Sequence, residues 1–193
     1  MALELPPQLQ ARLACLPAGL ADHVERVRDI ARELAGAHAI DTALADLTAA
    51  AHDVARHIPA SRLLEEAERI GLPVNFIERQ APVLLHGPVG AAWLWAEGSV
   101  TDAEAWAGVH WHTTAHADLS PVGQVVFLAD KLDQAKAVAY PFQAEVRAAA
   151  FASLTDGLLV FLDGALRQYL ERGDMIHPAS IEARNAYLLA ASC

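Results

Sequence analysis

Apolar residues recur at intervals of three and four positions along most of the chain, which is the spacing of one face of an α-helix. The clearest example is the set Leu20, Val24, Val27, Ala31 and Leu34. This helix is expected to end near Gly36. Further helices are predicted over residues 41–55, 60–70, 103–110, 121–132, 142–151 and 156–171, and from 180 onward. A short segment at 75–80 is followed by an apolar helix that ends at residue 96. Since no segment shows the alternation of a strand, the pattern predicts an all-α fold.

Residues that cap helices stand at several of the predicted starts. Asp41 or Thr42 can cap the second helix, and Ser120 precedes a proline at the first position of the helix over 121–132. The run Thr101-Asp102-Ala103-Glu104 has the form of a capping box, and Thr155 precedes the helix over 156–171. No repeat, linker or low-complexity tract interrupts the pattern. We therefore predict a single domain over residues 1–193.

The composition narrows the class of partner. The 193 residues match one typical domain, and a hydrophobic content of 54% argues against disorder. The formal net charge of −10 disfavours nucleic acid, whose binding depends on neutralising phosphates, and an anionic membrane surface. A phosphate-ester substrate would therefore need metal ions or a few well-placed cations.

The number of cysteines and the first residues of the chain indicate in which cellular compartment the protein is expected. Cys15 and Cys193 are too few and too far apart for a disulfide framework, which fits a reducing cytoplasm. The start MALELPPQLQ lacks the apolar run of a signal peptide. The apolar stretch 83–96 is broken by His86-Gly87-Pro88 and is too short to span a bilayer. A cytoplasmic protein is expected.

Histidines and acids recur at the ends of apolar helical segments, where a helical bundle can gather them into one site. Burying an aspartate that follows an apolar run costs free energy unless the carboxylate is paired or bound to a metal. Neutral imidazole and carboxylate are ligands for Fe, Mn, Co or Zn, which lower the pKa of a bound water. The residues in question are His23, His52, Asp53, His86, His112 and Asp130.

Single histidines carry less information than this ordered series. His38, His57 and His177, taken one at a time, fit hydrogen-bonded surface or core residues better than ligands. The dipeptide His52-Asp53 alone is short enough to occur by chance. The full series across an all-helical chain is much more specific.

The series resembles the HD-domain metal-dependent phosphohydrolases, and among them the YqeK-type symmetrical dinucleoside tetraphosphate hydrolases. The resemblance covers nearly the whole chain and includes the HD-domain helical bundle, with the helices from about residue 142 completing the site. The matching runs are His23-Val24-Glu25-Arg26-Val27, Ala51-His52-Asp53-Val54-Ala55-Arg56, Leu85-His86-Gly87-Pro88, Trp111-His112-Thr113-Thr114, Leu128-Ala129-Asp130-Lys131 and Ile176-His177-Pro178-Ala179-Ser180.

The resemblance implies a role for each matching position. The main metal, expected to be Fe with Mn or Co as alternatives, would be held by His23, His52, Asp53 and Asp130. His86 and His112 would face the substrate phosphates or complete a second metal site. Asp53, Arg56, His86 and His112 would form the catalytic set. Substrate contacts would come from His86, His112, Thr113, Lys136, Ile176 and His177.

The chain also departs from the family pattern. Ala115 and His116 stand where Gly-Arg usually follows His-Thr-Thr. The run Gln134-Ala135-Lys136 replaces Pro-Gly-Arg, and Leu20 stands in place of an arginine. These departures fall on cationic positions, so they bear on substrate choice more than on metal ligation, because lysine does not grip phosphate bidentately as arginine does.

The expected activity is symmetric cleavage of diadenosine tetraphosphate, or a related dinucleoside polyphosphate, to two nucleoside diphosphates by metal-activated water. Two alternatives remain: an HD phosphohydrolase of a nucleoside mono- or triphosphate, and a non-catalytic metal- and nucleotide-binding protein. The expected partner is a small nucleotide, with neither nucleic acid nor membrane. A homodimer is left open.

Overall fold

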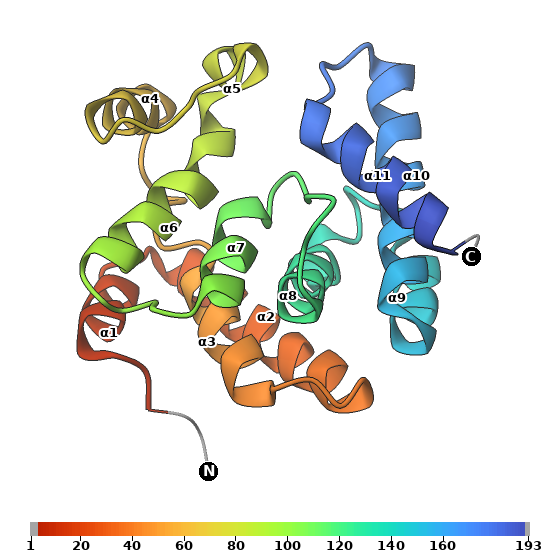
Figure 1. The fold of residues 1–193 in the computed structure, drawn as a ribbon, viewed down its shortest axis with the longest axis horizontal. Coiled ribbons are helices and arrows are strands. Elements are labelled where there is room, and N and C mark those ends of the chain that lie inside the picture. The colour runs from red at the N-terminus through yellow and green to blue at the C-terminus, as the bar shows by residue number, and fades with distance from the viewer. Residues whose placement is uncertain (1–3, 192–193) are drawn as a thin grey trace.

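The structure is a computed structural model that describes residues 4–191, and within this range it contains helices and no strand (Figure 1). The predicted all-α fold is thereby confirmed. The α-helices are α1 (Pro7–Ala14), α2 (Ala18–Ala37), α3 (Thr42–Ala51), α4 (Ala60–Arg69), α5 (Phe76–Gln80), α6 (His86–Ala96), α7 (Ala103–Trp111), α8 (Pro121–Lys131), α9 (Gln143–Ala152), α10 (Leu154–Arg172) and α11 (Pro178–Ala191). The short 3₁₀ helices are η1 (Pro82–Leu85) and η2 (Gln134–Lys136).

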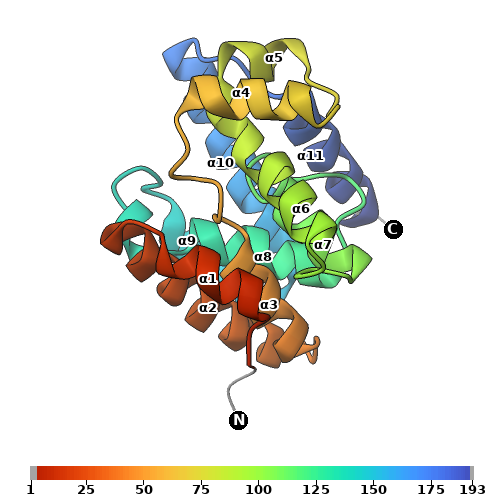
Figure 2. The same ribbon diagram turned by 90° about the vertical axis from the view of Figure 1, so that its left-hand side faces the viewer.

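Helices α2, α3, α7 and α8 form the centre of the molecule. α2 packs against α3 and α8, and α3 also contacts α7 and α8. α6 packs on α7 at one side, while α10 packs on α8, α9 and α11 at the other (Figure 1). α4 contacts η1 and α6 and lies beside α5, at the end of the molecule away from α2 and α3 (Figure 2).

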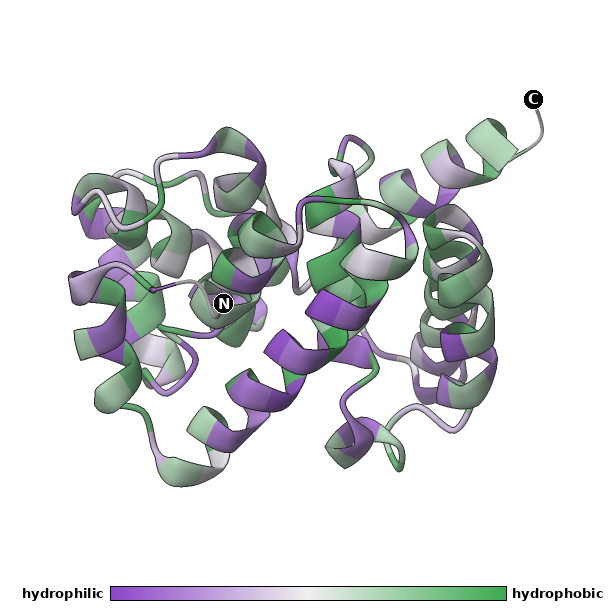
Figure 3. Cartoon of the chain, turned by 90° about the horizontal axis from the view of Figure 1, so that it is seen from below, coloured by the Kyte–Doolittle hydropathy of each residue, from purple (hydrophilic) through white to green (hydrophobic). Residues whose placement is uncertain are grey.

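The buried apolar side chains explain this arrangement. One core joins α2, α8 and α10 through residues such as Val27, Phe127 and Leu158. A second joins α1, α6 and α7 through Leu9 and Leu94, among others. Hydrophilic and hydrophobic residues alternate along the helices in the view from below, as expected for helices with one buried face (Figure 3).

Three boundaries differ from the sequence prediction. α3 ends at Ala51 and not near residue 55, because the chain continues as a turn through His52 and Asp53. Asp102 alone caps α7, accepting hydrogen bonds from the backbone N–H groups of Glu104 and Ala105, so Thr101 does not form the expected capping box. α10 begins at Leu154 and is capped by Ser153, not by Thr155.

The N-terminal helix α1 was not predicted, because its eight residues, PQLQARLA, are too few to show the periodicity of a helix clearly. Within the described residues, no helix is long and apolar enough to cross a membrane. Cys15 is exposed and unpaired, while Cys193 lies outside the described residues. The ends of the predicted domain, residues 1–3 and 192–193, lie outside that range as well.

Candidate metal centre

Six predicted ligands from five segments come together in the interior. His23 lies on α2, His52 and Asp53 follow α3, His86 opens α6, His112 follows α7 and Asp130 lies near the end of α8. Each is at most 8% exposed. The burial of six polar side chains at one place requires that they satisfy one another or a bound cation.

Three of the histidines are oriented in the same way. The Nδ1–H of His52 donates to the carbonyl of Ala49 at 2.6 Å, and that of His112 donates to Val109 at 2.7 Å. His86 makes the corresponding bond to Val83. A carbonyl oxygen only accepts, so Nδ1 carries a proton and the Nε2 atom of each ring faces the interior.

The Nε2 atoms form two pairs. In the first pair, His23 and His52, they are 3.3 Å apart; in the second pair, His86 and His112, they are 2.9 Å apart. Asp130 Oδ1 lies 3.1 Å from His23 Nε2 and 3.6 Å from His52 Nε2. The first pair therefore has a carboxylate oxygen of its own.

Asp53 lies between the two pairs and presents one oxygen to each. Its Oδ2 is 3.6 Å from the Nε2 atoms of both His23 and His52. Its Oδ1 is 3.0 Å from His86 Nε2 and 3.3 Å from His112 Nε2. This is the arrangement of a carboxylate that can bridge two metal ions.

The electrostatics of the centre favour a bound cation. Burial raises the pKa of Asp53, but the neighbouring His52, His112 and His86 outweigh burial and hold that pKa well below its usual range. Burial lowers the pKa of His112 to about 4. The carboxylate is thus charged and this imidazole neutral at pH 7, which are the protonation states that metals bind. Burial lowers the pKa of His52, and Asp53 and Asp130 raise it above its usual value in spite of that.

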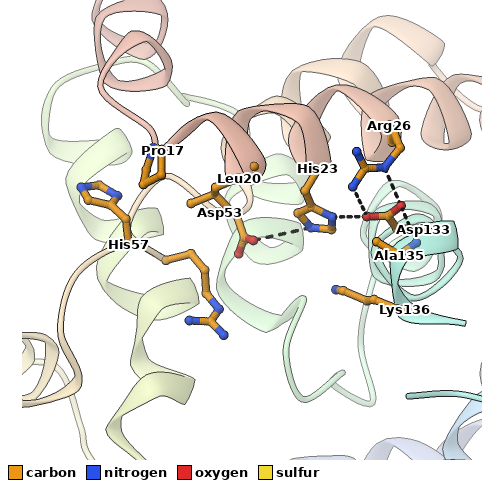
Figure 4. Close-up of a pocket in the computed structure, with 11 residues that line it drawn as sticks. Pro17, Leu20, His23, Arg26, Asp53, His57, Asp133, Ala135 and Lys136 are labelled. Carbon is orange, nitrogen blue, oxygen red and sulfur yellow. Dashed lines mark hydrogen bonds and ion pairs between the residues drawn. The ribbon is translucent and has the colours of Figure 1, made fainter. Parts of the chain in front are cut away.

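Asp133 supports the first pair from outside and was not identified from the sequence. Its Oδ2 accepts from His23 Nδ1 at 2.5 Å, which turns His23 Nε2 toward Asp130, while Arg26 Nε donates to Oδ1 at 2.7 Å (Figure 4). Burial raises the pKa of Asp133, but Arg26 and His23 lower it to about 2. Carboxylates that orient ligand histidines in this way are usual around metals. Its only signal in the sequence is its place three positions after Asp130, just beyond the end of α8.

Two lysines approach Asp130. Lys131 Nζ lies 2.7 Å from Oδ2, and Lys136 Nζ pairs with Oδ1. Burial raises the pKa of Asp130, but the two ammonium groups hold that pKa well below its usual range. Lys136 was expected to contact substrate, and the structure brings it to a predicted metal ligand at the edge of the pocket described next. Lys131 was not singled out by the sequence.

A pocket of about 460 Å³ opens beside the first pair, with His23 and Asp53 in its wall. Arg26, Arg56, His57 and Lys136 contribute positive or titratable groups to its lining (Figure 4). Arg56 forms no ion pair within residues 4–191. A chain of strongly negative net charge thus concentrates cationic groups next to the cluster.

A second pocket, of about 300 Å³, lies next to the segment that follows His112. It is lined by Thr113, by the apolar Ile77 and Leu84, and by Tyr169 and His177. His177 and the adjacent Ile176 therefore do not join the cluster. The ring of His177 contacts Asn75, whose Nδ2 lies 2.8 Å from Nε2.

His110 is separated from the cluster although it stands two positions before His112. Its ring lies between Trp106 and Trp111, with ring centroids 4.7 and 4.4 Å away. Its Nδ1 is buried without a hydrogen-bond partner among the described residues, and burial lowers the pKa of the ring to about 4. The structure therefore brings His112, and not His110, to the centre.

Comparison with known proteins identifies the family. The HD domain model matches residues 20–135, which is more than half of the chain and includes both histidine pairs, Asp53 and Asp130. The chain belongs to the HD domain family. A crystal structure of a predicted HD superfamily hydrolase involved in NAD metabolism from Clostridium acetobutylicum has the same fold, with a TM-score of 0.88 and 24% identity, over 95% of this chain and 96% of that one.

Relatives of this HD protein include enzymes named symmetrical bis(5'-nucleosyl)-tetraphosphatase. The one from Bacillus subtilis is 25% identical over 86% of this chain and 90% of its own length. The one from Halalkalibacterium halodurans is 26% identical over 86% and 88%. A third, from Staphylococcus aureus, is 24% identical over 64% and 63%.

The buried cluster, called the HD centre from here on, has the donor set of a divalent-metal site. It consists of His23, His52, Asp53, His86, His112 and Asp130. With Nδ1–H engaged by backbone carbonyls, the second pair directs two Nε2 atoms toward each other across 2.9 Å, and imidazole nitrogens brought together in this way suit a transition-metal cation. Among residues 4–191, two groups have ligand atoms that all lie within 4.8 Å of one another: His23, His52 and Asp130, and His52, Asp53 and His112. The residues present therefore fit a metal.

Proposed function

We propose that this HD protein is a metal-dependent hydrolase that cleaves diadenosine tetraphosphate, or a related dinucleoside polyphosphate, symmetrically to two nucleoside diphosphates. The observation that carries the proposal is Asp53, whose two oxygens face two histidine pairs beside a cation-lined pocket. The names of the relatives select the substrate from among phosphate esters.

In this proposal His23, His52, Asp53 and Asp130 hold the main metal, and His86 and His112 hold a second one together with Asp53. Iron is the proposed metal, and manganese or cobalt would suit the same nitrogen and oxygen donors. When bound, such a metal lowers the pKa of a coordinated water and neutralises phosphoryl oxygens.

Cationic side chains of the protein would bind the phosphates of the substrate. Arg56 and Lys136, at the pocket edge, would bind the outer phosphate oxygens and offset charge as it develops there. Thr113 and His177, which line the second pocket, would contact the nucleotide there, together with Ile176, which directly precedes His177 in the chain. The two pockets could then receive the two halves of a substrate whose central phosphates lie at the HD centre.

The proposal assigns the protein a small-molecule substrate in the cytoplasm and leaves a homodimer open. It is tested by offering the metal-loaded protein a panel of nucleotides and separating the products by chromatography. We expect turnover of the dinucleoside tetraphosphate to exceed that of nucleoside mono- and triphosphates. Preference for a monophosphate or triphosphate would favour the first alternative, and retained metal without turnover would favour a binding protein.

A further inference from the structure

Lys131 places a positive charge inside the protein, next to the HD centre. The residue is 6% exposed, and its Nζ lies 2.7 Å from Asp130 Oδ2 and 3.0 Å from the carbonyl oxygen of His112. The ring centroid of Phe127 is 4.9 Å from the same nitrogen. An ammonium group has three N–H donors, and two acceptors and an aromatic face surround this one. Its position is therefore well determined.

The contact with Asp130 divides the roles of the two carboxylate oxygens. Oδ2 is engaged by Lys131, whereas Oδ1 is the oxygen 3.1 Å from His23 Nε2 and 3.6 Å from His52 Nε2. A charge-assisted hydrogen bond in a buried setting is short and strong. It holds Oδ2 away from the first pair and leaves Oδ1, which also pairs with Lys136, as the oxygen that faces that pair.

The contact with His112 reaches the second pair. His112 directly follows α7, and its Nδ1–H is bonded to Val109 within that helix. Lys131 lies at the end of α8. The ammonium group of Lys131 thus links α8, which carries Asp130, to the backbone of His112, a member of the second pair.

We propose that Lys131 is a positioning residue of the HD centre, which restricts Asp130 to coordination through one oxygen and fixes the first histidine pair relative to the second. The inference rests on the proposed metal centre and does not depend on which nucleotide is cleaved. Lys136 differs, because it is partly exposed, lines the pocket and pairs with the oxygen that faces the histidines.

The test uses Lys131→Met, which retains most of the side-chain volume and removes the charge. Purified full-length protein is stripped of metal and titrated with Co²⁺, whose visible absorption reports ligand geometry. We expect a changed absorption spectrum and a Kd for Co²⁺ at least about tenfold weaker, the usual loss when a residue that orients a ligand is removed. The matched control is Arg28→Met, which breaks a partly buried ion pair to the buried Asp46 that involves no ligand of the HD centre. It should lose stability but keep the wild-type spectrum and Kd.

A folded Lys131→Met protein with the wild-type spectrum and Kd would overturn the proposal. If Lys131→Met does not fold, Lys131→Gln, which retains N–H donors without the charge, replaces it with the same expected result. If neither folds while Arg28→Met does, Lys131 is needed for the fold and the positioning role is wrong. Failure of the wild-type protein to bind Co²⁺ would instead contradict the proposed function.

Discussion

Asp53 presents one carboxylate oxygen to each histidine pair, so its removal affects both halves of the HD centre. We expect Asp53→Ala to lose bound metal and to reduce turnover by at least about 100-fold, since residues that merely orient a ligand already cost 10- to 100-fold. Elemental analysis and product formation measure the two effects. Asp163→Ala, which breaks a surface ion pair to Arg184, is the control and should leave both unchanged. Full metal content in Asp53→Ala would contradict its assignment as a ligand.

His110 and His112 form a natural pair for comparison, because they stand two positions apart and only His112 reaches the centre; His110 is partly buried and His112 is buried. We expect His112→Phe to lose activity and His110→Phe to keep it. Equal losses, or a larger loss in His110→Phe, would mean that the assignment of these two histidines is wrong.

The same His110 variant has a predicted effect on acid stability. Burial lowers the pKa of His110 from 6.5 to about 4, so between these pH values the unfolded chain holds a proton that the folded chain lacks. This residue therefore decreases the free energy of unfolding as the pH falls from 6.5 to 4. His110→Phe should gain about 2 kcal/mol over wild type across that range, a figure reduced from the full shift because part of the ring reaches solvent. Urea unfolding at pH 7 and pH 4.5 measures the difference, which should be absent if the ring titrates normally.

Lys136 belongs to the pocket as well as to Asp130. Lys136→Ala should raise KM about tenfold, the effect of losing one charged hydrogen bond to a phosphate, and leave metal content unchanged. Lys136→Arg should retain or improve affinity, because a guanidinium can bind two phosphate oxygens. Steady-state kinetics and metal analysis separate the two roles. A wild-type KM in Lys136→Ala would leave Arg56 and the loop at His177 as the next candidates.

At the scale of elements, the packing of α6 on α7 sets the second histidine pair. A Cβ on Gly87 would lie 2.7 Å from the carbonyl oxygen of His110, 3.0 Å from that of Val109 and 3.3 Å from His112 Cε1. Gly87 thus permits a close approach that a side chain would prevent.

We expect Gly87→Ala to destabilise the fold by about 1–3 kcal/mol and to weaken metal binding, because the two helices must separate. Gly36→Ala is the control, since a Cβ there has no neighbour within 4 Å and alanine favours the helix. Denaturant unfolding and metal titration provide the measurements. Equal stability and equal metal content in the two variants would contradict the role of the close approach.

Local signals predicted most helices, because their information lies within a few residues. The periodicity of α2 and the caps at Asp41 and Ser120 are examples. Where two cap-forming residues stand side by side, as in Thr101-Asp102, the sequence predicted a capping box from Thr101, whereas the structure uses Asp102 as the cap. The early end of α3 was not predictable either: on a continuous helix, His52 and Asp53 would point in different directions, and the turn lets both face the centre.

The supporting residues of the site were harder to predict than its ligands. The family resemblance named the histidines and Asp130, whereas the contact of His23 with Asp133 joins positions 110 apart in the chain and has no local pattern. Lys131 resembles any lysine at a helix end until the packing shows that it is buried over Phe127. Contacts that depend on how helices pack against one another cannot be predicted from the local pattern of a single sequence.

At the scale of the whole molecule, a chain of net charge −10 encloses a buried cluster of histidines and carboxylates. Its cationic side chains Arg26, Arg56 and Lys136 line the pocket beside this cluster. The overall charge explains why the protein is not expected to bind nucleic acid, while the local cations suit a small polyphosphate. The specificity of the enzyme is therefore expected to reside in the two pockets near the HD centre and not in its surface as a whole.

The most direct test of this account is the product pattern from diadenosine tetraphosphate, measured by chromatography with metal-loaded and chelator-treated protein. We predict that the loaded protein yields ADP as the nucleotide product, two per substrate, and that the chelated protein yields none until a divalent metal is restored. Formation of AMP and ATP, or full activity after removal of the metal, would contradict the account.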